Sequence, residues 1–269
     1  MCYRCDIAAK TLECEALAEA GVRHRMREYY LPMFESFLDK TAKAGAARAL
    51  DCGCGNGIAV EMLSQAGVSA YGVDMWEFRP QQWREREFER GAGCMFGDAT
   101  RLPFADNSFD IVMSCGLLEH IGVNEAWEPR YTVEPQSDQF EQRTNFMKEC
   151  LRVLKKPGVL YIDHPNGAFP VDFWHYTGNE GARPHWPWEK FLPDCSELND
   201  LLAAAGCRGR LESISPGRRF HYKQVGRKWW GQVFSAPSRA MFSLMELPLF
   251  RKLSATALNP YLVVRVESA

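Results

Sequence analysis

The residues best suited to bind a small ligand are three glycines at alternate positions after a short apolar run. Gly53, Gly55 and Gly57 follow Asp51, and an amphipathic segment begins at Ile58. A strand, a glycine turn and a helix in this order build nucleotide sites in α/β sheets. Glycine tolerates positive φ and lets the backbone approach a ligand, and the first helical turn presents unpaired N–H groups. These residues predict a loop that holds a nucleotide-like ligand.

A second acid closes the next apolar run. Asp74 follows the run 69–73 and lies 23 positions after Asp51. In a Rossmann-like sheet an acid at this point hydrogen-bonds ribose hydroxyls. A dinucleotide-binding G-x-G-x-x-G pattern would need glycine at position 58, where this chain has Ile58. A nicotinamide-dependent oxidoreductase is therefore only an alternative.

Five short motifs occur in the order in which one enzyme family has them. They are D-C-G-C-G-N-G (51–57), G-D-A (97–99), L-P-F with S-F-D (102–110), L-E-H (118–120) and R-V-L-K-K-P-G (152–158). Together they resemble the motifs of the class I S-adenosylmethionine-dependent methyltransferases, and the small-molecule branch of that family resembles the chain best. The resemblance is strong over residues 45–165 and implies S-adenosylmethionine as the cofactor.

The resemblance also implies the cofactor contacts. Asp51 would orient the glycine loop and the amino group of the cofactor, Asp74 would bind the ribose hydroxyls, and Asp98 would read the adenine edge. Each acid has a plainer alternative as a turn or N-cap residue. The remaining expected contacts are Gly53, Cys54, Gly55, Met75, Trp76, Ala99 and Cys115.

Four residues are candidates for the catalytic side. His120 follows the expected strand 110–114, and His164 directly follows the expected strand 159–163, so these two should face the same cleft. Asp163, the last residue of the strand 159–163, is the third candidate. His175 lies in a segment that resembles a loop of the small-molecule branch. A general base is needed only when the methyl acceptor is a hydroxyl or a protonated amine. Each histidine could instead be a hydrogen-bonded structural residue.

The sequence gives no pattern that is typical of a metal site. Cys2 and Cys5 form a C-x-x-C pair without a second pair at a fitting spacing. His164, His175 and His185 are spaced ten to eleven positions apart, which matches no zinc signature. We expect no metal from the spacing of these residues.

Strand and helix patterns alternate along the chain, which predicts an α/β fold with a Rossmann-like, doubly wound sheet. The sheet should be mostly parallel, with an antiparallel last strand, 261–266, at one edge. The expected strands are 47–52, 69–73, 93–96, 110–114, 159–163, a weaker 210–214, and 261–266, and the expected helices are 57–66, 80–90, 139–154 and 196–205.

The flanking segments predict the domain organisation. Two amphipathic helices, 6–20 and 22–43, broken at Gly21, should form an N-terminal cap over residues 1–45, either as a lid or, as we favour, as core packing. A methyltransferase domain should then occupy residues 46–269. Three long segments exceed what the bare fold needs and should lie on the substrate side: 122–138, 166–193 and the extended C-terminal insertion 215–259.

Composition indicates a globular cytoplasmic protein. The chain has 269 residues, of which 46% are hydrophobic, and its ten cysteines are scattered. Scattered thiols favour a reducing compartment. No apolar run reaches the ~18 residues that a membrane span needs, and the N-terminus lacks the pattern of a signal peptide.

Residues 215–252 depart from the charge of the rest of the chain. They carry eight basic residues and one acid, whereas the whole chain has a net charge of −2. Aromatic residues lie among these charges. Such a segment could contact a membrane surface, hold an anionic substrate, or form a solvated cover over the sheet.

The acceptor is expected to be a small-molecule or lipid-linked metabolite, methylated on oxygen or nitrogen. The N/D-P-P-aromatic motif of amino-methylating DNA enzymes is absent, because residues 114–117 read S-C-G-L. No nucleic-acid-binding module accompanies the basic segment. The other alternative is a non-catalytic S-adenosylmethionine-binding protein, and the sequence does not indicate an oligomeric state.

Overall fold

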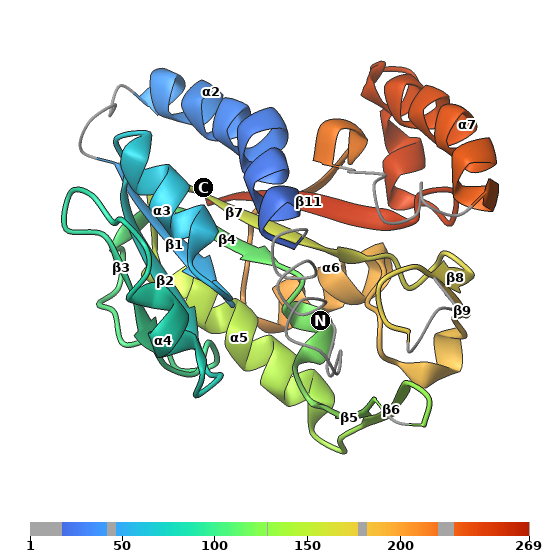
Figure 1. Ribbon diagram of the computed structural model, residues 1–269, viewed down its shortest axis with the longest axis horizontal. Helices are drawn as coiled ribbons and strands as arrows, with labels where there is room; N and C mark the ends of the chain where they lie inside the picture. The colour runs from blue at the N-terminus through green and yellow to red at the C-terminus, as the bar shows by residue number, and fades with distance from the viewer. Residues whose placement is uncertain (1–17, 42–46, 128, 177–181, 220–228, 269) are drawn as a thin grey trace.

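A seven-stranded sheet organises the chain (Figure 1). The computed structural model describes residues 18–41, 47–127, 129–176, 182–219 and 229–268. The strand order is β10-β11-β7-β4-β1-β2-β3. Its strands are β1 (Arg48–Cys52), β2 (Ser69–Asp74), β3 (Gly93–Phe96), β4 (Phe109–Cys115), β7 (Leu154–Pro165), β10 (Leu211–Ile214) and β11 (Tyr261–Ser268).

The predicted sheet is confirmed, with one correction to its topology. Strands β3, β2, β1, β4 and β7 pair in parallel, and β11 pairs antiparallel with β7. The expected edge position of β11 is wrong. It lies between β7 and β10, and it forms an antiparallel ladder with each of them. The burial of β11 matches this position inside the sheet, since the consecutive residues Leu262, Val263 and Val264 are all fully buried.

Helices cover both faces of the sheet because successive strand residues point to opposite sides. On one face, Ile111 and Met113 pack with α3 (Ile58–Gln65) and the N-terminal helix. On the other face, Val112 packs with α5 (Gln139–Val153) and α6 (Cys195–Ala204). The two buried clusters make the doubly wound core that alternating strand and helix patterns predict.

The N-terminal helix is part of this core. Residues 18–41 are continuously helical and include a π-helical turn, η1 (Met26–Tyr30), before α2 (Leu31–Thr41). The expected break at Gly21 is therefore wrong, and residues 6–17 of the predicted first helix lie outside the described residues. Tyr29 and Phe34 are buried against the sheet, which favours core packing over a free lid.

Two element boundaries also differ from the prediction. Strand β7 runs from Leu154 to Pro165 because it hydrogen-bonds β4 on one side and β11 on the other. The expected helix 80–90 shortens to α4 (Arg79–Trp83), with Pro80 in its first turn. Side chains at its end bind the glycine loop instead: Trp83 donates to the carbonyl of Gly55, and Arg86 donates to the carbonyl of Asn56.

The long segments contain small elements of their own. The segment 122–138 holds a hairpin of β5 (Val123–Ala126) and β6 (Thr132–Pro135). The segment 166–193 holds the short strands β8 (Val171–Asp172) and β9 (Arg183–Pro184) and the short helix η3 (Pro187–Glu189). These two segments pack against each other through Tyr131 and Phe191, whose ring centroids are 5.8 Å apart. The C-terminal insertion 215–259 contains the helices η4 (Gly217–Arg219), α7 (Trp229–Glu246) and η6 (Arg251–Ala255).

Candidate functional site

The glycine loop between β1 and α3 is shaped to hold a ligand. Gly53, Gly55 and Gly57 have φ of 76°, 56° and 81°, the left-handed region that favours glycine. The amides of Gly53 and Cys54 both donate to the carbonyl of Val73, at 2.8 and 3.1 Å. This pairing holds the loop against the end of β2, where ligands bind in open α/β sheets.

Asp74 at the end of β2 fixes this loop. Its side chain is buried, Oδ2 accepts from the amide of Gly55 at 2.9 Å, and Oδ1 accepts from the amide of Trp76 at 3.0 Å. The turn role that we weighed for Asp74 is therefore present. A carboxylate oxygen accepts more than one hydrogen bond, so this role leaves capacity for ribose hydroxyls.

Asp51 is an uncommon buried acid beneath the loop. The residue is 4% exposed, and among the described residues its Oδ1 has no hydrogen-bond partner. Burial, reinforced by the nearby charge of Asp74, raises the pKa of Asp51 to about 8. A cationic group that approached this carboxylate would restore its charged form, which suits the expected contact with a cofactor amino group.

We expect the stability of the cofactor-free protein to fall between pH 6 and 8 because of Asp51. The folded state keeps a proton there, with a pKa of about 8, that the unfolded state has already lost. Stability therefore decreases with rising pH by up to about 1.4 kcal/mol per pH unit. Denaturant unfolding at several pH values should show this slope reduced in Asp51→Asn. The exposed Asp98→Asn should leave the slope unchanged, and an unchanged slope in Asp51→Asn would contradict the assignment.

The other expected adenosine contacts are more open. Met75 and Trp76 follow β2 and are 62% and 51% exposed. Asp98 is exposed and accepts from the amide and hydroxyl of Thr100, both at 2.8 Å, while Ala99 is half-buried. Cys115 ends β4, and burial raises the pKa of its thiol to about 12, so the thiol stays neutral.

The segment after β4 joins the glycine loop to a group of polar side chains. A Cβ added at Gly53 would lie 3.0 Å from the Cβ of Leu117, so the two backbones approach closely there. Directly after Leu117 comes the short helix η2 (Leu118–His120), which carries Glu119 and His120. His120, one of the four predicted catalytic residues, is thus close to the predicted cofactor loop.

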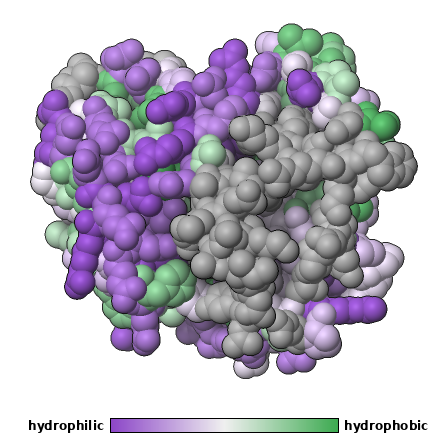
Figure 2. Space-filling view, in the orientation of Figure 1, coloured by the Kyte–Doolittle hydropathy of each residue, from purple (hydrophilic) through white to green (hydrophobic). Residues whose placement is uncertain are grey.

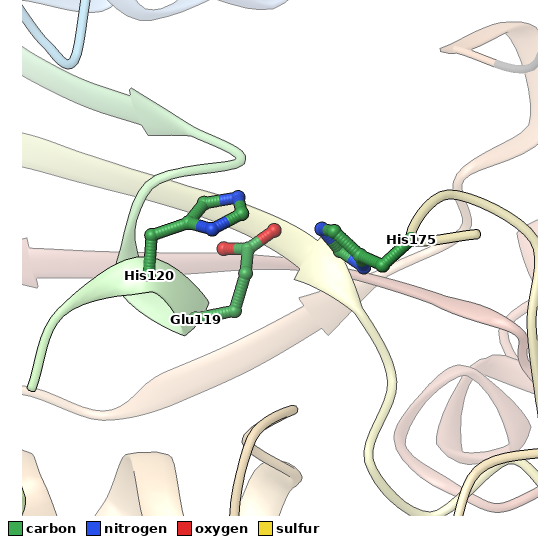
Figure 3. A group of neighbouring side chains, drawn as sticks. All are labelled: Glu119, His120 and His175. Atoms are coloured by element: carbon green, nitrogen blue, oxygen red, sulfur yellow. The ribbon is translucent and has the colours of Figure 1, made fainter. Parts of the chain in front are cut away.

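Glu119, His120 and His175 converge in the structure (Figure 3). One polar atom of each lies within 4.8 Å of the others. Glu119 is 1% exposed, and its Oε2 has no hydrogen-bond partner among the described residues. The rings of His120 and His175 lie 5.1 Å apart at a steep angle. Two of the four catalytic candidates are therefore brought together, although 55 positions separate them.

A carboxylate from each neighbouring insertion orients one of these histidines. Nδ1 of His120 is hydrogen-bonded to Glu125 of β5. Nδ1 of His175 lies 3.0 Å from Oδ2 of Asp172, which Arg183 also contacts at 3.3 Å. Burial lowers the pKa of His120, but the hydrogen bond to Glu125 and the charge of Glu119 outweigh burial and raise it.

Asp163, another of the four catalytic candidates, does not join this group. It is 1% exposed and forms a two-point ion pair with Arg219, with N–O distances of 2.8 and 2.9 Å. The hydroxyl of Tyr261 donates to Oδ1 of Asp163 at 2.6 Å. Burial lowers the pKa of Arg219, but the charge of Asp163 outweighs it and raises the pKa. These bonds give Asp163 a structural role.

His164 also differs from the prediction. It lies inside β7, paired with Leu262 of β11, and is fully buried. Side chains alternate along a strand, so His164 and Asp163 point to opposite faces of the sheet. Nδ1 of His164 contacts the carbonyl of Pro165 at 2.8 Å. A fully buried side chain does not line a cleft, so the expectation that His164 faces the same cleft as His120 is wrong.

The sequence reasoning missed the partners that complete these groups. Glu119 stands inside the recognised L-E-H motif, and Asp172 lies three positions before His175, so both could have been proposed from local spacing. Glu125 and Arg219 had no such signal. Their roles depend on how an insertion folds back on the sheet.

The chain was compared with known proteins. Residues 50–162 match a family model described as a methyltransferase domain. Over these residues the chain is similar to methyltransferases, and the strand order and the glycine loop agree with that match.

Curated relatives carry the same description. A protein of Mycolicibacterium smegmatis, named "Probable S-adenosylmethionine-dependent methyltransferase", is 26% identical over 66% of this chain and 59% of its own length. The ubiquinone biosynthesis O-methyltransferase of Pseudomonas aeruginosa is 31% identical over 34% of this chain and 40% of its own length. The ubiquinone biosynthesis O-methyltransferase of Actinobacillus pleuropneumoniae is 24% identical over 68% of this chain and 73% of its own length. The chain thus spans less than two thirds of the first two relatives.

Solved structures agree on the fold. A methyltransferase from Mesorhizobium loti has a TM-score of 0.50 at 14% identity, with 88% of this chain and 96% of that chain covered. The [4+2]-cyclase SpnF also has a TM-score of 0.50 at 19% identity, with 88% of this chain and 80% of that chain covered. At these identities the likeness shows the fold alone.

Proposed function

We propose that the chain is an S-adenosylmethionine-dependent methyltransferase that acts on a small-molecule or lipid-linked metabolite and methylates an oxygen or a nitrogen. The observation that carries the proposal is the Glu119–His120–His175 group beside the glycine loop. An acceptor bound there would lie next to the cofactor. The proposal includes the insertions 122–138 and 166–193 as the acceptor side of the domain.

Methyl transfer from a sulfonium asks for alignment and exclusion of water more than for covalent chemistry. In the proposed reaction the glycine loop and Asp74 hold the cofactor. The β5–β6 hairpin and the loop that follows β8 hold the acceptor against η2. When the acceptor is a hydroxyl, the imidazole of His120 is placed to receive its proton, and Glu125 stabilises the charged ring.

The small-molecule assignment has two supports. The ubiquinone biosynthesis relatives are named as O-methyltransferases. The two insertions that we propose for the acceptor side share a buried apolar cluster of Tyr131, Phe191 and Leu192, which gives these short segments a fixed shape suited to a compact acceptor. The seven described cysteines are free, which supports our placement of the protein in the cytoplasm.

The cofactor assignment predicts a large loss on substitution of Asp74. Asp74→Ala should weaken binding of S-adenosylhomocysteine by about 1.5–3 kcal/mol, because a charge-assisted contact to the ribose is lost. Calorimetry on the folded variants measures the binding of S-adenosylhomocysteine. Glu77 is an exposed acid nearby, so Glu77→Ala is the matched control.

Thermal shift with S-adenosylhomocysteine and NAD side by side tests the assignment itself. Stabilisation by S-adenosylhomocysteine alone supports it, whereas stabilisation by NAD alone would favour the oxidoreductase alternative. A metabolite screen with labelled cofactor separates an enzyme from a non-catalytic binding protein.

We also propose a peripheral membrane contact through residues 215–252. Apolar residues gather over α7 (Figure 2), where Val233 and Phe234 are each 61% exposed, and Leu249 beyond the helix is 84% exposed. The basic residues Lys223, Arg227 and Lys228 lie outside the described residues, as do the side chains of Trp229 and Trp230. Among the described helices, none is long and apolar enough to cross a membrane.

Vesicle co-sedimentation tests this contact. Binding to anionic vesicles should exceed binding to neutral ones and weaken with salt, since each basic residue near such a surface adds roughly 1 kcal/mol. Arg227→Glu with Lys228→Glu should remove the anionic preference. Arg84→Glu with Arg101→Glu, both exposed and outside this segment, should preserve it. Absence of sedimentation under all conditions would leave the segment as a cover over the sheet.

A further inference from the structure

We infer that Glu119, His120 and His175 form a binding site for a divalent transition-metal ion of the Zn²⁺ type. This inference rests on the proposed function only for the role of the ion, because binding of the ion is argued from the residues alone. It replaces the expectation of no metal, which considered the spacing of cysteines and of His164, His175 and His185.

The first observation is the geometry of the donors. One possible ligand atom from each of the three side chains lies within 4.8 Å of the other two. Glu119 and His120 come from η2, and His175 comes from the loop after β8, with their polar ends turned toward one another (Figure 3). Ligands on one ion are separated by distances of this order, since Zn–N and Zn–O bonds are about 2.0–2.2 Å.

The second observation is an unsatisfied carboxylate. Glu119 is 1% exposed, and among the described residues its Oε2 makes no hydrogen bond. An unpaired buried carboxylate oxygen is destabilising, because it has lost its hydrogen bonds to water and gained none in the protein. A cation held between Glu119 and the two imidazoles would remove this cost.

The third observation is the support behind each histidine. Glu125 holds Nδ1 of His120, and Asp172 holds Nδ1 of His175 at 3.0 Å. Metal-bound histidines usually donate their second ring N–H to a carboxylate or a carbonyl, which fixes the tautomer and the ring orientation. Both imidazoles therefore have Nε2 left as a ligand atom.

The donor set indicates the class of ion. Two imidazoles and one carboxylate suit Zn²⁺, Fe²⁺, Co²⁺ or Ni²⁺, whereas Mg²⁺ prefers oxygen ligands and keeps its waters. Three protein ligands also leave a coordination position for a further group, as in catalytic rather than structural zinc sites.

In the proposed reaction, that position would receive the hydroxyl oxygen of the acceptor. Coordination would lower the pKa of the hydroxyl, and because His120 would then be a ligand of the ion, the proton would pass to water instead of to its ring. The oxygen then forms a bond to the methyl carbon as the S–CH₃ bond breaks. The electron pair of that bond stays on sulfur, which gives neutral S-adenosylhomocysteine. No oxidant or reductant is needed.

Cobalt(II) is the most informative probe, because cysteine sites would also bind Zn²⁺. The full-length chain, freed of metal with a chelator, should bind Co²⁺ with visible d–d bands and without a thiolate-to-cobalt charge-transfer band. Glu119→Gln and His175→Gln should each weaken binding by about tenfold or more, given that even changes behind the ligands cost 10–100-fold.

His185→Gln is the matched control, because His185 is a buried histidine of the same insertion outside the three-residue group. It should bind Co²⁺ as the unmodified chain does. Circular dichroism checks the fold of each variant, and if Glu119→Gln fails to fold, His175→Gln decides the test. Absence of d–d bands, bands unchanged in both ligand variants, or a thiolate band alone would overturn the inference.

Calorimetry with S-adenosylhomocysteine on the same samples separates the two proposals. Loss of metal binding with normal cofactor binding overturns the metal site and leaves the methyltransferase assignment intact. Metal binding without cofactor binding would support the site and contradict the proposed function.

Discussion

Replacing Arg219 with methionine is expected to lower the free energy of unfolding by about 3–5 kcal/mol, because the variant leaves a buried charge without its partner. Asp163 lies in the centre of the sheet at 1% exposure, and Arg219 makes both of its ion-pair bonds from the C-terminal insertion. The guanidinium also lies 3.8 Å from the ring centroid of Tyr261. Denaturant unfolding followed by circular dichroism measures the loss.

Two comparisons test the cause of this loss. Arg219→Met with Asp163→Asn should recover much of the stability, because the unpaired charge is gone. Arg251→Met removes an exposed pair with Glu212 and should cost at most about 1 kcal/mol. Equal effects of Arg219→Met and Arg251→Met would show that the buried pair contributes no more than a surface pair.

His120→Ala is expected to lower turnover by about 10²–10⁴-fold when the acceptor is a hydroxyl, with little change in cofactor affinity. The loss of turnover is expected in either role of His120. The ring would either take the proton of the acceptor hydroxyl or bind an ion that lowers the pKa of that hydroxyl. Transfer of a labelled methyl group to an acceptor from the metabolite screen measures turnover, and calorimetry with S-adenosylhomocysteine measures affinity.

The matched variants follow from the structure. Glu134→Gln changes an exposed acid on β6 of the same hairpin and should keep full turnover. His164→Ala should lower stability and spare turnover, because His164 is buried within β7. Full turnover in His120→Ala would mean that alignment alone suffices or that another residue receives the proton.

The cofactor half of the fold was predictable because its signals are local. Apolar runs end in Asp51 and Asp74, glycines occupy positions that require positive φ, and Pro80 begins a helix. Each of these features depends on a few neighbouring residues. The strand bounds of β1, β2 and β3 therefore agree with the prediction to within one residue.

The position of β11 and the pairing of the site residues depend instead on contacts between segments that are distant in the sequence. The apolar run at the start of β11 indicates a strand that is buried on both faces, but it does not reveal that the strand lies between β7 and β10. His120 and His175 could be proposed separately, whereas their meeting depends on how the two insertions pack around Tyr131. Asp163 was placed on the correct strand, but its partner Arg219 comes from a segment without a recognised motif.

The central position of β11 has a consequence for synthesis of the chain. Strand β10 has β11 as its neighbour in the sheet, yet β11 is translated after the whole α7 segment. Tyr29 of the first helix donates to the carbonyl of Ser215, 186 positions later. The apolar faces of the N-terminal helix and β7 therefore stay partly uncovered until β11 has been synthesised. Contacts between such distant residues form late and leave aggregation-prone surface exposed meanwhile, so insertion of β11 is the step that closes this part of the core.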